Sequence, residues 1–355
     1  MKLFAFLALG ALLGADASRP DQTASAPAPV ETRLDVRLNP LADLQLLLRW
    51  YLEGSRPADS PPGAFFLNGV FSKAAEELRL LEGQLGGPRA WGLLEGVFAS
   101  VDSSKALAAL AEELPESFRS MDGRDFPLRE LGRSLAKVLG SAEPAFLQHD
   151  WPRREARLEQ EAERLRSGFA GKERDCLAYM LRSLGMEDPK ATIPVLLVTE
   201  APWPGAMTHR RRGGGGVCFV GLSANVEGTL LQETVLHEAT HALDILDAEK
   251  GNVLEELRGL LRKAGIEERD PRFRDAPHTL MFVQAGETVR RVLEPKHVHY
   301  GDAAGYYAKF PSLAPAIREA WTGNLDGKVT REAALERIVE AARSAPASRP
   351  TGGGF

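Results

Sequence analysis

The hydrophobic pattern divides the chain into a long helical part and a shorter part that contains strands. From about residue 38 to residue 184, apolar residues recur every three or four positions, which is the spacing of amphipathic helices. We therefore predict a helical N-terminal domain over residues 32–188. The segments that carry the pattern are PLADLQLLLRWYL (40–52), AFFLNGVFSKAAEELRLLEG (64–83), SKALAALAEEL (104–114), PLRELGRSLAKVLG (127–140) and RREARLEQEAERLRSGF (153–169).

The pattern changes after Asp188 and Pro189. ATIPVLLVTEA (191–201) and GVCFVGLS (216–223) are short apolar runs rich in β-branched residues, and we predict a strand in each; the intervening glycine-rich segment is predicted as a loop. The predicted fold is mainly α with a small β-sheet (α+β), and residues 189–345 form a second domain. Helices are predicted at about 228–248, 252–264, 276–294, 312–322 and 329–343.

Both ends of the chain differ from this pattern. Lys2, an apolar run over residues 3–13 and the small-residue site at residues 15–17 have the layout of a cleavable signal peptide over residues 1–17. Residues 18–31 are rich in Pro, Ala and Ser, which is typical of a flexible linker, and residues 346–355 are predicted to be a disordered tail. We expect a secreted or periplasmic protein with no stable membrane insertion after cleavage, because no later apolar run is long enough to span a bilayer.

Charge and cysteine content narrow the classes of function. The formal net charge is -5, and the isoelectric point is near 5.9, whereas nucleic-acid binding usually requires a basic surface. We therefore expect no nucleic-acid partner. Cys176 and Cys218 can form one disulfide or remain two buried thiols, and their spacing is not that of a zinc-thiolate site.

Candidate chemistry lies in HEATH, residues 237–241, within a predicted helix. Residues four apart share a helix face, so His237 and His241 can direct two imidazoles to one ion. Glu238 is placed beside that ion, where it can accept a proton from water. On a helical wheel the apolar residues gather on one side, and the opposite side contains Glu233, His237, Thr240, His241 and Asp244.

This arrangement resembles the zincin metallopeptidases, which contain HExxH on a helix beneath a small twisted sheet. The resemblance covers roughly residues 190–310. It implies a zincin-like catalytic domain, a bound Zn²⁺, a peptide or protein substrate, and hydrolysis through a zinc-bound water that Glu238 activates. It also implies that the strand before the helix, residues 216–223, holds the substrate main chain by strand addition.

Three carboxylates compete as the third metal ligand. Asp247 stands ten residues after His237, as in metzincins, but a continuing helix would turn it away. Asp244 shares the histidine face and is predicted to lie in the second shell, where it orients a ligand, although it can equally be a solvated carboxylate. Glu287 is a lone carboxylate on an apolar helix, 46 residues after His241, and the resemblance to gluzincins favours it; the alternative is a salt bridge to Arg290 or Arg291.

A donor for the oxyanion is expected in KHVHYGDAAGYYAKF, residues 296–310. The candidates there are His297, His299, Tyr300, Tyr306 and Tyr307, and we favour Tyr306 and Tyr307 as catalytic residues. His297 and His299 can also be a surface pair. His278 is predicted to lie outside any site that contains Glu287, because the two are half a turn apart on their helix.

Two functional hypotheses follow. The first is an exported gluzincin-like zinc metallopeptidase whose ligands are His237, His241 and Glu287. The second is a catalytically inactive zincin-like binding module of the cell envelope, because about 150 helical residues contain no recognisable chemistry. The arginines at 210–212 can meet an acidic substrate or form a solvated loop.

Overall fold

The computed structural model describes most of the chain, with gaps. The described residues are 30–52, 69–85, 94–96, 99–119, 125–201, 205–211, 214–222, 226–247 and 251–346. The predicted signal peptide, nearly all of the predicted linker and all but the first residue of the predicted tail therefore lie outside the described residues.

The described residues confirm a mainly helical fold with a small mixed sheet. The predicted helices occur close to their expected positions, and α10 continues into a π-helical turn, Val289–Leu293. The α-helices are α1 (Pro40–Leu52), α2 (Gly69–Leu85), α4 (Ser104–Glu112), α5 (Leu128–His149), α6 (Trp151–Phe169), α7 (Glu173–Leu184), α8 (Thr229–Asp247), α9 (Val253–Lys263), α10 (Pro271–Thr288), α11 (Tyr300–Ala303), α12 (Leu313–Leu325) and α13 (Arg331–Ser344).

Four strands form the main sheet in the order β1-β4-β6-β5. β1 pairs in parallel with β4, β4 pairs in parallel with β6, and β5 pairs antiparallel with β6 at one edge. The strands are β1 (Arg33–Leu38), β4 (Thr192–Val198), β5 (Ala206–Arg210) and β6 (Gly216–Gly221). A separate short ribbon pairs β2 (Phe118–Arg119) with β3 (Asp125–Phe126).

The two strands predicted from apolar runs, β4 and β6, form the buried centre of the sheet. Their side chains alternate between two cores, as the two-residue period of a strand requires. Val195 and Cys218 belong to the large core that includes α8, whereas Leu196 and Phe219 belong to a smaller core with α1. Strands buried on both faces are continuously apolar, which is why the sequence identified them.

The sheet also contains two strands that the sequence analysis missed. β1 alternates charged residues with Leu34, Val36 and Leu38, which is a strand signal next to the strong helical pattern that follows. β5 lies in the segment predicted as a loop, and four of its five residues are half-buried, so it lacks the alternation that marks a strand with one buried face.

The order of the strands corrects the expected place of substrate binding. β6 lies between β4 and β5, so its main chain is paired on both sides. A substrate strand therefore cannot add to residues 216–221. The edge strand beside α8 is β5, and strand addition on this side of the sheet would use β5.

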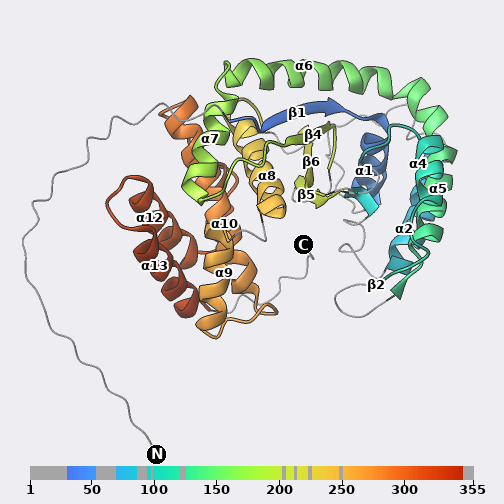
Figure 1. Cartoon of the computed structure of the whole chain (residues 1–355). Helices are drawn as coiled ribbons and strands as arrows, with labels where there is room; N and C mark the ends of the chain where they lie inside the picture. Colours follow the sequence, from blue (N-terminus) through green and yellow to red (C-terminus); the bar gives the residue numbers. More distant parts are fainter. Residues whose placement is uncertain are drawn as a thin grey trace, which may run out of the picture.

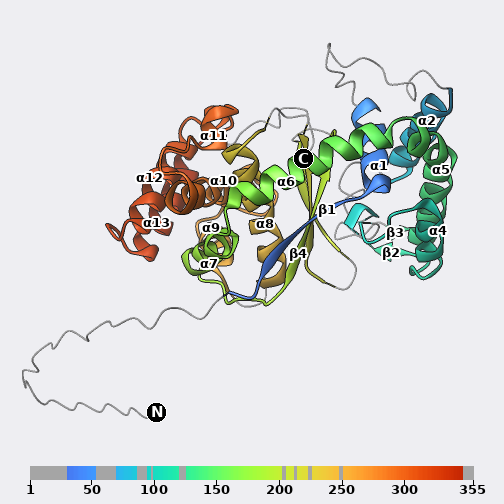
Figure 2. The ribbon, with the colours of Figure 1, turned by 90° about the horizontal axis from the view of Figure 1, so that it is seen from above.

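The helices cover both faces of the sheet. Figures 1 and 2 show α8 and the C-terminal helices α9, α10, α12 and α13 on one side, and α1 followed by α2, α4 and α5 on the other. α6 spans the two groups. One large hydrophobic core extends from Leu34 to Ala345 and so includes residues from before and after residue 188. Within the described residues, no helix is long and apolar enough to cross a membrane.

Candidate metal centre

The HEATH segment lies in the middle of α8, as predicted. α8 packs on the sheet through its apolar face, where Ala239 and Leu243 are buried. This packing orients the opposite face of the helix toward a cavity lined by Glu233, His237 and His241. The Nε2 atoms of His237 and His241 lie 3.2 Å apart.

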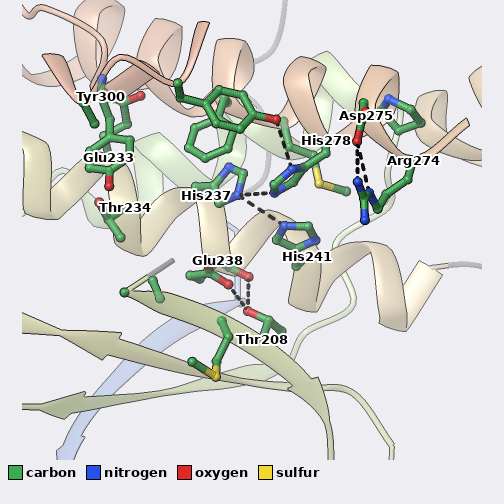
Figure 3. Close-up of a pocket in the computed structure, with 18 of the residues that line it drawn as sticks. Thr208, Glu233, Thr234, His237, Glu238, His241, Arg274, Asp275, His278 and Tyr300 are labelled. Atoms are coloured by element: carbon green, nitrogen blue, oxygen red, sulfur yellow. Dashed lines mark hydrogen bonds and ion pairs between the residues drawn. The ribbon is translucent and has the colours of Figure 1, made fainter. Parts of the chain in front are cut away.

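A third imidazole, from His278 on α10, completes the group. Its Nε2 atom lies 3.2 Å from Nε2 of His237. The ligand atoms of His237, His241 and His278 all lie within 4.8 Å of one another, and they form the group of side chains among the described residues that could hold a metal ion. Figure 3 shows the three rings facing a common centre.

The geometry of this cluster fits a divalent transition metal. Two imidazole nitrogens bound to zinc at about 2.0–2.1 Å in tetrahedral geometry are roughly 3.3–3.4 Å apart, and the two observed separations are 3.2 Å. Three neutral imidazoles whose nitrogens meet at one point cannot all form hydrogen bonds with one another, because each ring has a single N–H to donate. A cation accepts all three lone pairs, and three protein ligands leave a further position open.

The surroundings keep the three imidazoles neutral. Burial lowers the pKa of His241 to about 4, against the opposing effect of the Asp244 carboxylate. Burial, assisted by the nearby His241, lowers the pKa of His278 to about 3. The pKa of His237 is lowered well below its usual value by burial and by the two neighbouring imidazoles. Near neutral pH the rings therefore offer lone pairs to a metal.

Glu238 lies on the side of α8 that faces β5. Its Oε2 atom accepts a hydrogen bond from the Thr208 hydroxyl at 2.6 Å (Figure 3). Burial raises the pKa of Glu238 from 4.5 to about 7, and the Thr208 hydrogen bond only partly opposes this effect. A carboxylate with its pKa near neutrality can both take up and release a proton, as a general base that later acts as an acid must.

The histidines and Glu238 line a cavity of about 600 Å³. Its walls come from β5, α8, α10 and the segment around α11, and they are mainly apolar. Cavities of this size and character are typical of binding sites for small molecules or peptide segments. The apolar part of the lining comprises Ala206, Met207, Val226, Phe273, Pro277, Met281, Phe282, Ala304, Tyr306 and Phe310.

Glu287 does not join the histidines, contrary to the sequence prediction. Its carboxylate is bound by Arg290 at 2.6 Å and Arg291 at 2.9 Å, with His299 at 3.3 Å. Burial opposes ionisation, but these donors lower the pKa of Glu287 to about 2. The salt bridge considered as the alternative is thus the observed arrangement, and the resemblance to the gluzincin ligand set does not extend to this residue.

The other two carboxylates also lie outside the cluster. Asp247 is the last residue of α8 and is not part of the group that could hold a metal ion, as expected if the continuing helix turns it away. Asp244 is bound by Arg258 at 2.6 Å and by Asn252. The Asp244 charge raises the pKa of His241. Its oxygens accept hydrogen bonds from Arg258, and no hydrogen bond joins them to the His241 imidazole among the described residues.

The two favoured tyrosines occupy different positions. The Tyr306 hydroxyl lies 3.2 Å from Nδ1 of His278. When Nε2 of a neutral imidazole binds a cation, Nδ1 carries the proton, and this N–H donates a hydrogen bond to such an oxygen. Tyr306 is therefore placed to orient His278. Tyr307 instead lies 3.5 Å from Nδ1 of His299 and does not line the cavity.

The remaining candidates for the oxyanion donor also occupy different positions relative to the cavity. Tyr300 lines the cavity, and its ring stacks on Phe282, which stacks on His237. His297 and His299 are buried, so they are not a surface pair. His297 lies 2.5 Å from the carboxylate of Glu233. Glu233 is one helical turn before His237 on α8.

The structure also shows the two cysteines and two of the three arginines. Cys176 and Cys218 are both buried and free. Arg210 and Arg211 are exposed, and Arg212 lies outside the described residues.

His278 is the residue that sequence reasoning excluded. It lies nine residues before Glu287, on the opposite face of the same helix. The sequence predicts that these two residues lie on opposite faces of one helix, but it does not predict which of the two faces packs against α8. The available signal was a histidine and an aromatic residue, Phe282, four positions apart on one face.

The chain was also compared with known proteins. No family model, no curated protein and no solved structure matches it.

Proposed function

We propose that this protein is a zinc-dependent peptidase whose metal is held by His237, His241 and His278. The observation that carries the proposal is the convergence of three neutral imidazoles beside a buried glutamate in a cavity bordered by an edge strand. The HExxH pattern supports zinc over other divalent ions, because imidazole ligands and a neighbouring general base suit a zinc hydrolase. The resemblance to the zincins supports this proposal, with His278 in place of Glu287 as the third ligand.

Each residue has a role that its position supports. A zinc ion in this site would act as a Lewis acid toward the scissile carbonyl and lower the pKa of a water molecule. Glu238 takes a proton from the attacking water, whose oxygen bonds to the carbonyl carbon. When the C–N bond breaks, Glu238 returns that proton to the leaving amine, so that one water is consumed for each bond cleaved. Thr208 holds the Glu238 carboxylate in place through its 2.6 Å hydrogen bond.

The edge strand supports a peptide as the substrate. β5 can pair with an extended main chain, and the mainly apolar cavity beside it can accept side chains. Tyr300 is the tyrosine we now favour as oxyanion donor, because its side chain lines the cavity and no hydrogen bond to its hydroxyl occurs among the described residues.

The deciding experiment measures metal content and peptide cleavage together. Wild-type protein and Glu238→Gln are purified, their zinc is quantified, and both are incubated with a complex peptide mixture whose new termini are read by mass spectrometry. We expect near-stoichiometric zinc in both proteins. Cleavage should fall by about 10²–10⁴-fold in the variant, the typical contribution of a general base.

The alternative outcomes are distinct. Zinc in both proteins without any cleavage would favour the non-enzymatic binding module. Absence of zinc in a correctly folded wild-type protein would refute the peptidase and also a metal-bearing form of the binding module.

We also propose that the protein is exported. The support is the sequence of residues 1–17, which has the layout of a signal peptide. N-terminal sequencing of protein secreted by its own cells should begin at Ser18, and protein that retains residues 1–17 would contradict export by this route.

A further inference from the structure

The outer edge of β5 offers a short row of main-chain groups beside Glu238. The N–H of Gly221 donates to the carbonyl of Gly205, and the N–H of Arg211 donates to that of Gly215. These bonds fix the phase of the antiparallel ladder, in which every second residue faces its partner strand. Ala206, Thr208 and Arg210 therefore direct their N–H and C=O groups away from β6, toward the free edge.

One end of this edge is closed by a segment from the N-terminal part of the chain. A Cβ atom on Gly96 would lie 2.0 Å from the Arg210 carbonyl oxygen, so the Gly96 backbone is pressed against the outward face of Arg210. The neighbouring residue, Glu95, is 2% exposed and is ion-paired with Arg49, and Nε2 of His209 lies 2.8 Å from its carboxylate. These three side chains line the cavity.

The other outward groups remain available. No hydrogen bond from the described residues reaches the main-chain N–H or C=O of Ala206 or Thr208. Thr208 is level with Glu238, because its hydroxyl donates to the Glu238 carboxylate and also lies 3.0 Å from the Glu238 main-chain carbonyl oxygen. The usable edge thus begins near the candidate metal centre and extends in one direction, toward Ala206.

Strand polarity determines which part of a substrate meets the closed end. A peptide that pairs antiparallel with β5 runs opposite to it, so its N-terminal residues lie toward Arg210 and its C-terminal residues toward Ala206. From Thr208 to Arg210 is two residues, or roughly 7 Å at about 3.4 Å per residue. That length accommodates one or two substrate residues before the scissile bond.

We propose that the segment Leu94–Gly96, with the buried Arg49–Glu95 pair and the neighbouring His209, restricts this protein to cleavage near the N-terminus of its substrates. The enzyme would be an exopeptidase of the aminopeptidase or dipeptidyl-peptidase class. The helical N-terminal part then acts as the wall that closes the cleft. This inference rests on the proposed peptidase function.

The first test uses the wild-type protein and a series of fluorogenic peptides with one, two, four or six residues before the same scissile bond. We expect kcat/KM to fall at least about tenfold between two and four residues, because a longer chain must displace a buried ion pair. Equal or faster cleavage of the longer peptides would overturn the restriction and leave the peptidase function intact. If no peptide is cleaved in a manner that depends on Glu238, the peptidase function itself has failed.

A variant tests the role of the closing segment. Gly96→Ala places a methyl group where the Arg210 carbonyl lies, so the segment must move off the edge of β5. Gly83→Ala is the matched control, because nothing lies within 4 Å of a new Cβ there. We expect the four-residue to two-residue rate ratio to rise about tenfold in Gly96→Ala, the effect of a change near 1.4 kcal/mol, and to stay unchanged in Gly83→Ala.

A binding measurement gives a readout that does not require turnover. The Glu238→Gln protein is titrated with labelled peptides of the same series, and fluorescence anisotropy gives Kd. We expect Kd to increase at least about tenfold between two and four leading residues. An unchanged Kd across the series would contradict a closed end, including in the case that Gly96→Ala fails to fold.

Discussion

At the scale of single residues, the candidate metal centre depends on whether the Nε2 atoms of three histidines point to one position. His237 and His241 are brought together by the helix alone, since four residues span about one turn. His278 comes from another helix, and its ring is held from behind by the Tyr306 hydroxyl at 3.2 Å. A partner on Nδ1 fixes both the tautomer and the orientation of a ligand imidazole.

Replacing Tyr306 should weaken metal binding without unfolding the protein. Tyr306→Phe removes the oxygen that faces His278, and loss of such a partner typically costs about 10–100-fold in metal affinity. Tyr307→Phe is the matched control, because the adjacent hydroxyl faces His299 instead. Competition with a zinc chelator measures both affinities, and equal affinities in the two variants would exclude a positioning role for Tyr306.

The residues of HEATH could be assigned from the sequence because their chemistry is local. Their spacing alone places two imidazoles and one carboxylate on adjacent parts of one helix. The third ligand could not be assigned in the same way, because it depends on the rotation of α10 about its own axis. Glu287 was predicted as a metal ligand because a lone charge on an apolar helix needs a partner. In the structure Arg290 and Arg291 are the partners that neutralise this charge.

At the scale of elements, the position of the site is set by α8 packing directly on the sheet. β6 contains Gly216 where it meets α8, and a Cβ atom there would lie 2.8 Å from both Cα and Cβ of Ala242. This contact allows the helix to lie close enough for Glu238 to reach Thr208 on β5. Residues from β5 and α8 therefore share one cavity.

Gly216→Ala should separate α8 from the sheet. We expect a loss of about 1–3 kcal/mol in the free energy of unfolding, the usual cost of overpacking a core. Gly259→Ala in α9 is the control, because nothing lies within 4 Å of its new Cβ, and alanine there should be neutral or slightly stabilising. Urea unfolding measures both variants, and equal stabilities would show that the α8–β6 contact is not tight.

The helices and strands that could be predicted from the sequence are those whose pattern of buried positions is regular. Long amphipathic helices and the doubly buried strands β4 and β6 have strong periodic or continuous apolar patterns. β5 is an edge strand with a mixed environment, so its role depended on pairing with β6 rather than on its own sequence. This strand supplies Thr208 and the outward main-chain groups, so missing it misplaced the expected substrate strand.

At the scale of the whole molecule, the N-terminal and C-terminal parts share a sheet, a core and buried ion pairs. β1 pairs with β4, and Glu95 accepts from Arg49 and lies 2.8 Å from His209, two residues that lie far apart in the sequence. Burial alone would raise the pKa of Glu95, but these two partners outweigh it and lower the pKa from 4.5 to about 2. Glu95 therefore stabilises the folded state when ionised.

This linkage predicts a specific loss of stability in acid. The folded-state pKa lies below the unfolded one, so the contribution of Glu95 is complete above pH 4.5 and declines as the pH falls toward 2. Urea unfolding of wild type and Glu95→Gln should differ most at pH 7, and the difference should shrink by about 2 kcal/mol at pH 3, at roughly 1.4 kcal/mol per pKa unit. Glu76→Gln, in an exposed pair with Arg79, is the control and should show little dependence. A difference that is constant with pH would contradict an ionised Glu95 in the folded state.

The three-histidine centre is tested most directly by the zinc affinities of wild type, His278→Ala and Glu287→Gln. All three are measured side by side with a competing chelator. We expect His278→Ala to bind zinc at least about 100-fold more weakly than wild type, because it loses one of three protein ligands. Glu287→Gln should retain the wild-type affinity, since its carboxylate is occupied by Arg290 and Arg291. Wild-type affinity in His278→Ala, together with a large loss in Glu287→Gln, would contradict the three-histidine centre.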